Sequence, residues 1–173
     1  MRICTSALVA LAAVILGAWP VEAQDAKAVQ VTPYVAPGTE GSSPFGVAVM
    51  FPVTSTLGIE TDVAYRRGEG RMHALSTNSS LLWFLPRAGQ ATPYLAGGVG
   101  LRRYGTPVFS LAGAPIDTQS RVAFTVNAGG GLEMPLNNTL DMRTDARWFK
   151  SFGKEGSEQF RVAQGISFNA GKR

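Results

Sequence analysis

Apolar and polar residues alternate along most of this chain with a period of two. In residues 121–134, for example, Val122, Phe124 and Val126 fall on one face, with Thr125 on the other. The same period recurs in three further stretches, residues 45–51, 57–66 and 140–148. A period of two is the pattern of β-strands that have one apolar face, so the chain is predicted to be all-β.

Turn signals group the predicted strands into hairpins. Three stretches share one layout, in which an apolar strand ends in a hydrophobic residue and a proline, a short polar turn follows, and a second strand begins: residues 45–65, 80–101 and 124–149. Pro52, Pro86 and Pro135 mark the strand ends, since proline has no N–H to donate to an interior ladder. A first strand near 29–36 and a last near 159–168 bring the predicted number to eight.

The composition of the less apolar strand face decides between a soluble and a membrane barrel. A soluble barrel points its apolar face at a core and its polar face at water. Here the second face mixes acids and bases with Gly, Ala and Ser. Small residues and pairable charges suit a narrow closed interior, and the apolar residues then face lipid. Because strands that cross a membrane must leave no open edge, we predict an eight-stranded antiparallel up-and-down transmembrane β-barrel.

The two faces define the candidate site residues. A lumen charge network is expected from side chains of inward parity: Glu60, Asp62, Arg66, Arg102, Arg121, Glu133, Asp141, Arg143, Asp145, Arg147 and Arg161. Lipid-facing positions are expected at Val47, Val49, Ile59, Val63, Val122, Phe124, Val126, Leu140 and Met142. An unpaired charge in a dry lumen costs several kcal/mol, so the charges are predicted to pair and plug the barrel. A proton or ion path is the alternative use of the same residues.

Aromatic residues recur near the predicted strand ends, where a membrane barrel has its interfacial girdles. They are Phe51, Tyr65, Trp83, Phe84, Tyr94, Tyr104, Trp148 and Phe149. We expect these rings to lie at the two membrane interfaces.

The first 23 residues have the layout of a secretory signal peptide. Arg2 provides the basic start, residues 7–19 provide the apolar core, and residues 21–23 form a small-residue cleavage site. Residues 24–173 would then form a single barrel domain, a length that suits one domain.

Charge and cysteine content exclude some function classes. Removal of Arg2 and Glu22 with the signal peptide takes 16 basic and 12 acidic residues to 15 and 11, so the net charge stays at +4. This excess is modest and dispersed, and nucleic-acid binding is not indicated. The one cysteine, Cys4, lies within the signal peptide, so the mature chain is expected to have no disulfide.

Residues that could carry catalysis or bind a metal are few. Gly129–Gly131 are followed by an alternating strand and not by a helix start, so they are not expected to bind phosphate. His73 is the single histidine and has opposite strand parity to Ser76, while Ser79 lies too far along a strand to pair with it. No catalytic residue, cofactor or metal site is predicted.

The chain resembles the small eight-stranded outer-membrane β-barrels of Gram-negative bacteria, the OmpA-like and OmpX-like barrels. The resemblance is carried by PYLAGGVGL (93–101), by residues 126–149 and by FRVAQGISF (160–168). It implies an outer-membrane location, contact with outer-membrane lipid, and the barrel-assembly machinery as a partner in biogenesis. Chains of this family usually end on an aromatic residue, whereas here Phe168 is followed by Asn-Ala-Gly-Lys-Arg.

The expected function is therefore that of a non-enzymatic integral outer-membrane protein with a plugged interior and a structural or surface-interaction role through its loops. A soluble periplasmic barrel that binds a small apolar ligand, or a lipid-modifying barrel enzyme, are the alternatives. The longest loop is expected near 105–118. Its apolar residues form either a contact surface or a cover over the barrel mouth: Val108, Phe109, Leu111 and Ile116.

Overall fold

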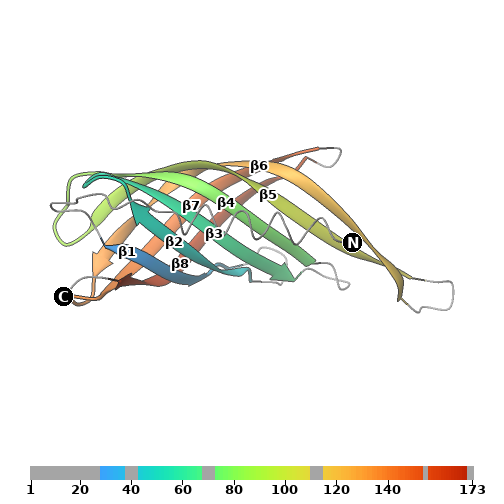
Figure 1. Ribbon diagram of the computed structural model, residues 1–173, viewed down its shortest axis with the longest axis horizontal. Helices are drawn as coiled ribbons and strands as arrows, with labels where there is room; N and C mark the ends of the chain where they lie inside the picture. Colours follow the sequence, from blue (N-terminus) through green and yellow to red (C-terminus); the bar gives the residue numbers. More distant parts are fainter. Residues whose placement is uncertain (1–27, 38–42, 68–72, 110–114, 154–155, 171–173) are drawn as a thin grey trace.

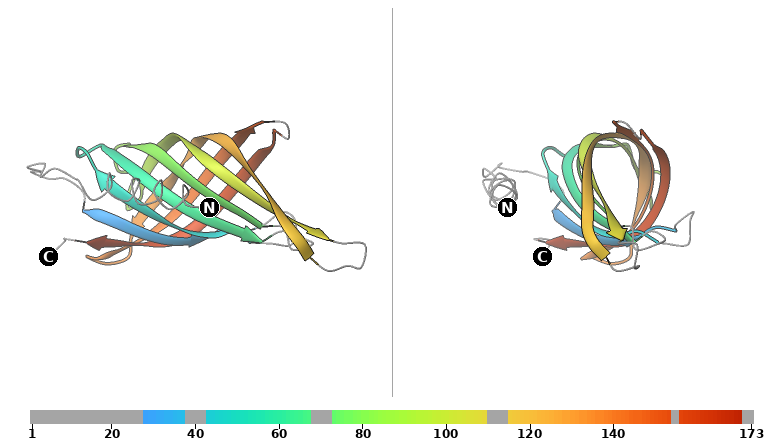
Figure 2. Two further views of the ribbon diagram at one scale, coloured as in Figure 1. Left: turned by 45° about the vertical axis from the view of Figure 1, so that its right-hand side comes forward. Right: turned by 90° about the vertical axis from the view of Figure 1, so that its right-hand side faces the viewer.

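The alternating strands close on themselves. In the computed structural model, each of eight strands pairs antiparallel with its neighbours in sequence, and β1 pairs with β8 to complete a barrel (Figures 1 and 2). The strands are β1 (Val29–Val35), β2 (Phe45–Pro52), β3 (Leu57–Arg67), β4 (His73–Phe84), β5 (Thr92–Phe109), β6 (Pro115–Pro135), β7 (Leu140–Phe152) and β8 (Glu158–Ala170). The predicted fold class is confirmed.

The structure describes residues 28–37, 43–67, 73–109, 115–153 and 156–170. The predicted signal peptide, residues 1–23, lies outside the described residues. Among the described residues, no helix is long and apolar enough to cross a membrane.

The prolines end strands where the sequence predicts. β2 ends at Pro52 and β6 at Pro135, and Pro86 lies just after β4. Side-chain oxygens close two of the turns that follow: Thr54 Oγ1 accepts the Leu57 N–H at 2.9 Å. Asn137 Oδ1 accepts the N–H groups of Thr139 and Leu140 at 2.9 Å each. These short turns lie at the barrel end where β1 begins and β8 finishes.

The hairpin of β5 and β6 extends past its neighbours. Pairing with β4 stops at Gly105, and pairing with β7 stops at Phe124, but β5 and β6 stay paired as far as Phe109 and Pro115. The two strands therefore leave the barrel as a two-stranded ribbon, visible at the right of Figure 1.

Most of the loop expected near 105–118 is thus strand, and this prediction was wrong. Its proline and glycine content indicated a loop, yet proline is tolerated in an edge strand that has a free side. Only residues 110–114 of that segment lie outside the described residues.

The seam between the first and last strands is interrupted. Val31 pairs with Phe168 and Tyr34 with Gly165 in the same register, but the ladder is missing at Thr32 and Pro33. Proline has no N–H to donate. The hydroxyls of Thr32 and Ser167, 2.7 Å apart, bridge the two strands at this point.

Candidate functional site

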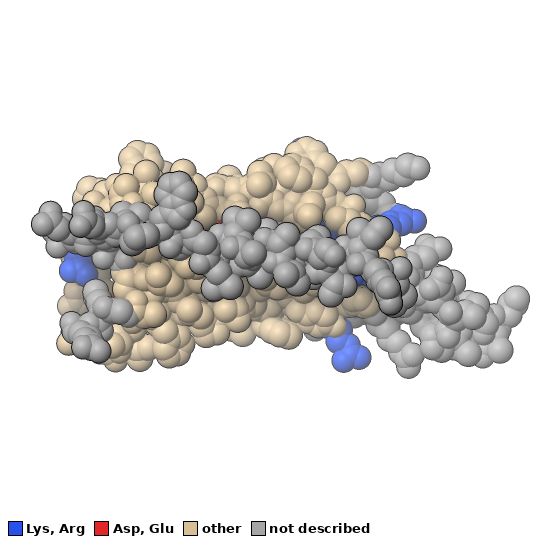
Figure 3. All heavy atoms as spheres, in the orientation of Figure 1, with Lys and Arg blue, Asp and Glu red and all other residues tan. Residues whose placement is uncertain are grey.

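The outer wall of the barrel is apolar. Side chains at the predicted lipid-facing positions all point outward: Val47, Ile59, Val63, Val122 and Phe124 are exposed, and Val49, Val126, Leu140 and Met142 are half-exposed. On the face shown in Figure 3, Lys and Arg side chains lie toward the two ends, and the visible wall between them is almost free of charge. A wall of this kind is stable against hydrocarbon and not against water.

The barrel interior holds charged side chains that meet across the lumen. Glu60 on β3 is 2 % exposed, and both its carboxylate oxygens bind arginines of β7. Arg143 Nη1 donates to Glu60 Oε2, and Arg147 Nη2 donates to Glu60 Oε1 at 2.7 Å. Each guanidinium thus spans the interior to reach the carboxylate, which ties opposite walls together.

Asp145 shares the same two arginines. Its Oδ2 accepts a hydrogen bond from Arg147 Nε at 2.9 Å and lies 3.7 Å from Arg143 Nη2. The Tyr94 hydroxyl donates to the same oxygen at 2.8 Å and accepts from Arg143 Nε at 2.7 Å. Since Tyr94 is on β5, this phenol links the charged cluster to a third part of the wall.

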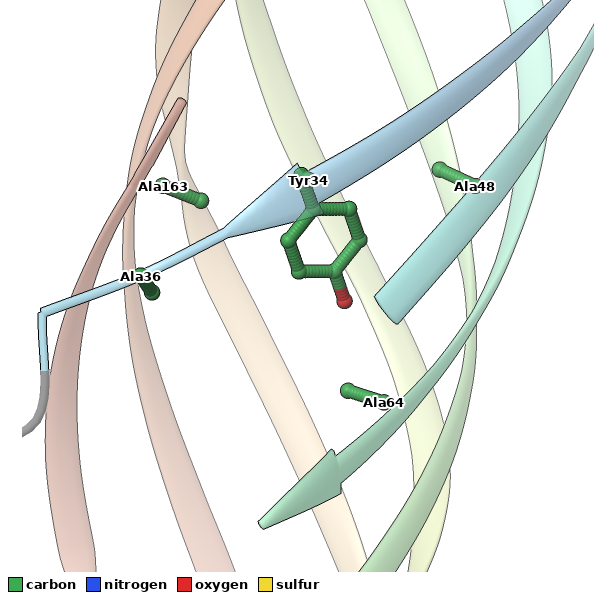
Figure 4. Close-up of a cluster of buried hydrophobic side chains, with 5 residues drawn as sticks. All are labelled: Tyr34, Ala36, Ala48, Ala64 and Ala163. Carbon is green, nitrogen blue, oxygen red and sulfur yellow. The ribbon is translucent and has the colours of Figure 1, made fainter. Parts of the chain in front are cut away.

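A second cluster lies beside the first. Arg161 on β8 has its Nη1 3.6 Å from Asp62 Oδ2, and it donates to the Tyr34 hydroxyl at 3.0 Å. Tyr34 in turn donates to Asp62 Oδ2 at 2.9 Å. The Arg161 guanidinium also stacks on the ring of Phe149, 4.6 Å from its centroid. Figure 4 shows the Tyr34 ring projecting into the interior among small residues, Ala48, Ala64 and Ala163.

The charges of these clusters balance. Three carboxylates, from Glu60, Asp62 and Asp145, face three guanidiniums, from Arg143, Arg147 and Arg161, and all six residues are buried. The cavity that remains between them gives the centre of a water molecule about 20 Å³ of space. That volume holds about one water, so this level of the lumen is filled by side chains.

Apolar side chains fill the lumen toward the end with the short turns. Met50, Leu82, Phe84, Tyr94 and Ala96 form one buried cluster. The rings of Phe84 and Tyr94 lie 5.7 Å apart. The ionic clusters are therefore followed by a hydrophobic layer along the barrel axis.

Glycine makes room for the interior rings at two positions. A Cβ on Gly131 would lie 2.6 Å from Cζ of Tyr94, and a Cβ on Gly46 would lie 2.7 Å from Cζ of Tyr34. Real Cβ atoms do not approach other atoms so closely. The lack of a side chain at Gly46 and Gly131 therefore leaves room for the rings of Tyr34 and Tyr94, whose hydroxyls hydrogen-bond the arginines.

The predicted lumen residues divide into two groups. Glu60, Asp62, Glu133, Arg143, Asp145, Arg147 and Arg161 are buried inside the barrel. Arg66 and Arg102 are half-buried, and Asp141 lies near the turn end, where it accepts hydrogen bonds from Asn169 at 2.7 Å and Gln30 at 3.3 Å. Arg121 is exposed, because β6 at that position has passed the last residue that pairs with β7.

Several aromatic rings expected at the membrane interfaces lie in the lumen instead. Phe84, Tyr94 and Phe149 are each at most 4 % exposed and face inward, so this interpretation was wrong for them. Trp83 and Trp148 do face outward. Strand parity predicts the correct face for these rings, since Phe149 has the same parity as the inward-facing Arg147. Position near a strand end does not predict the face.

Polar partners inside the lumen were also missed. Asn78 donates to both oxygens of Asp62, at 3.2 and 3.3 Å, and Arg147 Nη1 donates to the Ser80 hydroxyl at 3.2 Å. Ser80 then donates to Asn127 Oδ1 at 3.2 Å. Their inward parity is readable from the sequence, but neutral side chains carry no charge pattern that marks them as partners of the acids and arginines.

The residues considered for catalysis do not come together. His73 is exposed on the outer face and stacks on Tyr65, with ring centroids 6.5 Å apart. Ser76 is half-buried and donates to the Ala64 carbonyl, whereas Ser79 lies beside Thr61, 3.2 Å between hydroxyl oxygens. In the described part of the chain, no three His, Cys, Asp or Glu side chains are grouped as metal ligands would be.

Comparison with known proteins identifies the fold. No protein-family model matches the chain, and no curated protein sequence matches it. Among solved structures, it is similar to Neisserial surface protein A, with a TM-score of 0.63, 10% identity, and coverage of 83% of this chain and 96% of that one. It is also similar to the N-terminal β-barrel domain of Pseudomonas aeruginosa OprF, with a TM-score of 0.60, 16% identity, and coverage of 86% and 99%.

A third similar structure is the outer-membrane enzyme PagL, with a TM-score of 0.50, 14% identity, and coverage of 81% of this chain and 99% of that one. The predicted outer-membrane location agrees with these matches. At such low identity the likeness concerns the fold, and one fold can carry different activities. The chain thus has the fold of the small eight-stranded outer-membrane β-barrels.

Proposed function

We propose that the protein is a non-enzymatic integral outer-membrane barrel whose interior is plugged and whose role is structural or one of surface interaction. The observation that carries the proposal is the salt bridge of Glu60 with Arg143 and Arg147 across the lumen. A pore would need water along the axis. Here three buried acids, three buried arginines and a hydrophobic layer occupy the cross-section instead, as an eight-stranded barrel is narrow enough to permit.

The surface role is proposed for the end of the barrel opposite the start of β1 and the end of β8. The ribbon of β5 and β6 projects there beyond the other strands. Segments held away from a rigid scaffold are where binding surfaces of such proteins are usually built. Outer-membrane lipid and, during biogenesis, the barrel-assembly machinery are the further partners that we propose.

A soluble barrel that binds an apolar ligand fits the molecule less well. Its ligand would occupy the interior, where the central level is charged and offers about 20 Å³. The apolar side chains that such a protein needs inside are outside here, for example Val99 and Leu101, each about half exposed. A lipid-modifying enzyme would need a base and nucleophile close together, and His73 and Ser79 are separated by six residues along one strand, about 20 Å.

Measurements of ion conductance and of heat-dependent gel mobility test whether the interior is plugged and whether the protein inserts into a membrane. The protein refolded from urea into phosphatidylcholine bilayers should give a gel band that changes mobility on heating and should show no stable porin-like current in planar bilayers. Well-defined open channels from the unmodified protein would overturn the plugged interior. A protein that stays in the soluble fraction and shows no heat-dependent mobility change would overturn membrane insertion.

A further inference from the structure

The apolar band of the outer wall gives way to polar residues on four neighbouring strands. Among the residues whose side chains the structure describes, the last apolar or aromatic outward ones are Tyr65 on β3, Leu75 on β4, Leu101 on β5 and Val122 on β6. The next outward residue toward the rim is polar or charged on every one of them: Arg67, His73, Arg103 and Ser120. These positions therefore mark the edge of the apolar wall at the end where β3 finishes and β4 begins.

Three of these residues are neighbours on the outer surface. Arg67 is directly opposite His73 in the pairing of β3 with β4. Arg103 is opposite Leu75, which lies two residues from His73 on the same face. Diagonal neighbours in a sheet are within reach of long side chains. We call Arg67, His73 and Arg103 the basic rim cluster.

The central member of the cluster is held in place. The His73 ring stacks on Tyr65 with 20° between their planes, and Tyr65 in turn contacts Phe45 with ring centroids 5.6 Å apart. Across the next strand the imidazole lies over Gly105, where a Cβ would come within 2.5 Å of His73 Cε1. Gly105 thus leaves a shallow seat for the ring, flanked by the two arginines.

Among the carboxylates that the structure describes, none neutralises the arginines of the cluster. Both are exposed, and in the part of the chain that the structure describes no carboxylate lies within salt-bridge distance of Arg67 or Arg103. The other side of the barrel differs: Lys150 on β7 binds Glu158 on β8, 3.2 Å between Nζ and Oε1. The described carboxylates therefore leave positive charge on this sector of the rim, directly above the apolar wall.

We propose that the basic rim cluster binds the phosphate of a lipid headgroup, whose acyl chains lie on the apolar wall beneath it. Guanidinium groups bind phosphate oxygens through paired N–H donors, and cations placed next to a membrane surface attract anionic lipid. Leu75 and Leu101 lie immediately below the cluster, on the path of the chains. The inference rests on the membrane insertion proposed above.

Native mass spectrometry tests the site. The full chain, refolded in a neutral detergent, is titrated with dioleoyl phosphatidic acid, which carries a phosphate monoester, and separately with dioleoyl phosphatidylcholine. The wild type should bind the phosphatidic acid with preference over the phosphatidylcholine. The double variant Arg67→Gln/Arg103→Gln should weaken that binding roughly 10- to 30-fold, and Arg67→Lys/Arg103→Lys should recover part of it.

The matched control is Arg87→Gln, since Arg87 is also exposed but lies in the turn after β4, at the opposite end. It should leave binding unchanged. Equal losses in the control and the double variant, or equal affinity for the two lipids, would overturn the inference. Displacement by inorganic phosphate at a concentration equal to that of the lipid would show that the cluster takes free phosphate, and would overturn the lipid as its occupant.

Insertion is scored separately by the heat-dependent gel shift of each variant. A chain that fails to insert refutes the proposed function, whereas a chain that inserts and binds both lipids equally refutes only the basic rim cluster.

Discussion

Arg147 and Glu60 bind each other across the lumen from strands that lie opposite in the barrel ring. The Nη2–Oε1 distance is 2.7 Å, and the residues are 87 positions apart in sequence. β3 and β7 are four strands apart around a ring of eight in either direction. This salt bridge, the Glu60–Arg147 brace, therefore connects opposite sides of the barrel wall.

Removal of one charge from this brace should be costly. Glu60→Gln would leave Arg143 and Arg147 with one carboxylate in place of two, in a site closed to water. We expect the free energy of unfolding to fall by about 3–5 kcal/mol, measured by urea titration of the barrel refolded in phosphatidylcholine vesicles.

The control for that experiment is Glu158→Gln, which removes an exposed carboxylate from its bond with Lys150. Exposed pairs contribute about 0–1 kcal/mol. If the two variants lose equal stability, the interior pair is not desolvated in the way the structure indicates.

Space for the Tyr94 ring should depend on Gly131. In Gly131→Ala, the new Cβ would lie 2.3 Å from the Thr144 carbonyl oxygen and 2.6 Å from Cζ of Tyr94, so the β7 backbone and the ring must both shift and the bonds of Tyr94 to Asp145 and Arg143 must lengthen. Overpacking of this kind costs about 1–3 kcal/mol. The measurement is the temperature at which the folded gel band disappears.

Gly97→Ala provides the comparison, because a Cβ there meets its nearest atom at 3.9 Å. It should leave that temperature nearly unchanged. A larger effect at Gly97 than at Gly131 would contradict the assigned positions of the inward and outward faces.

The stability lost when a charge is placed on the outer wall should depend on how deep in the membrane the position lies. Val99 is 51% exposed and lies on the outer face near the middle of its pairing with β4. Val99→Arg is expected to destabilise the inserted barrel by about 2–4 kcal/mol, measured as the shift in urea midpoint in vesicles. Val53→Arg, at an exposed valine in the turn after β2, should cost far less. Equal costs would place Val99 in water.

The period of two was sufficient to predict the number of strands and the inward side of Glu60, Asp145 and Arg147. Alternation fixes the face of every residue once a strand is recognised. It does not say which acid meets which base, because that depends on how the strands tilt and stagger around the ring. The partners of Glu60 therefore emerge only from the closed barrel.

Two errors have physical causes. Position near a strand end predicts Phe84, Tyr94 and Phe149 at the membrane interfaces. These rings lie in the lumen instead, because large side chains are also required there to exclude water. The loop expected near 105–118 was inferred from its glycine and proline content. Cross-strand pairing outweighs that content when two strands continue together beyond the sheet.

The missing backbone pairs at Thr32 and Pro33 make the seam between β1 and β8 a weak part of the barrel wall. A closed ring of strands has no edge, so it must part somewhere before it can unfold. The first and last strands lie together by closure alone and are joined by no turn, and here their ladder is broken and bridged by a pair of hydroxyls. The ring would therefore unzip along this seam, and in assembly the same seam would be the last to close.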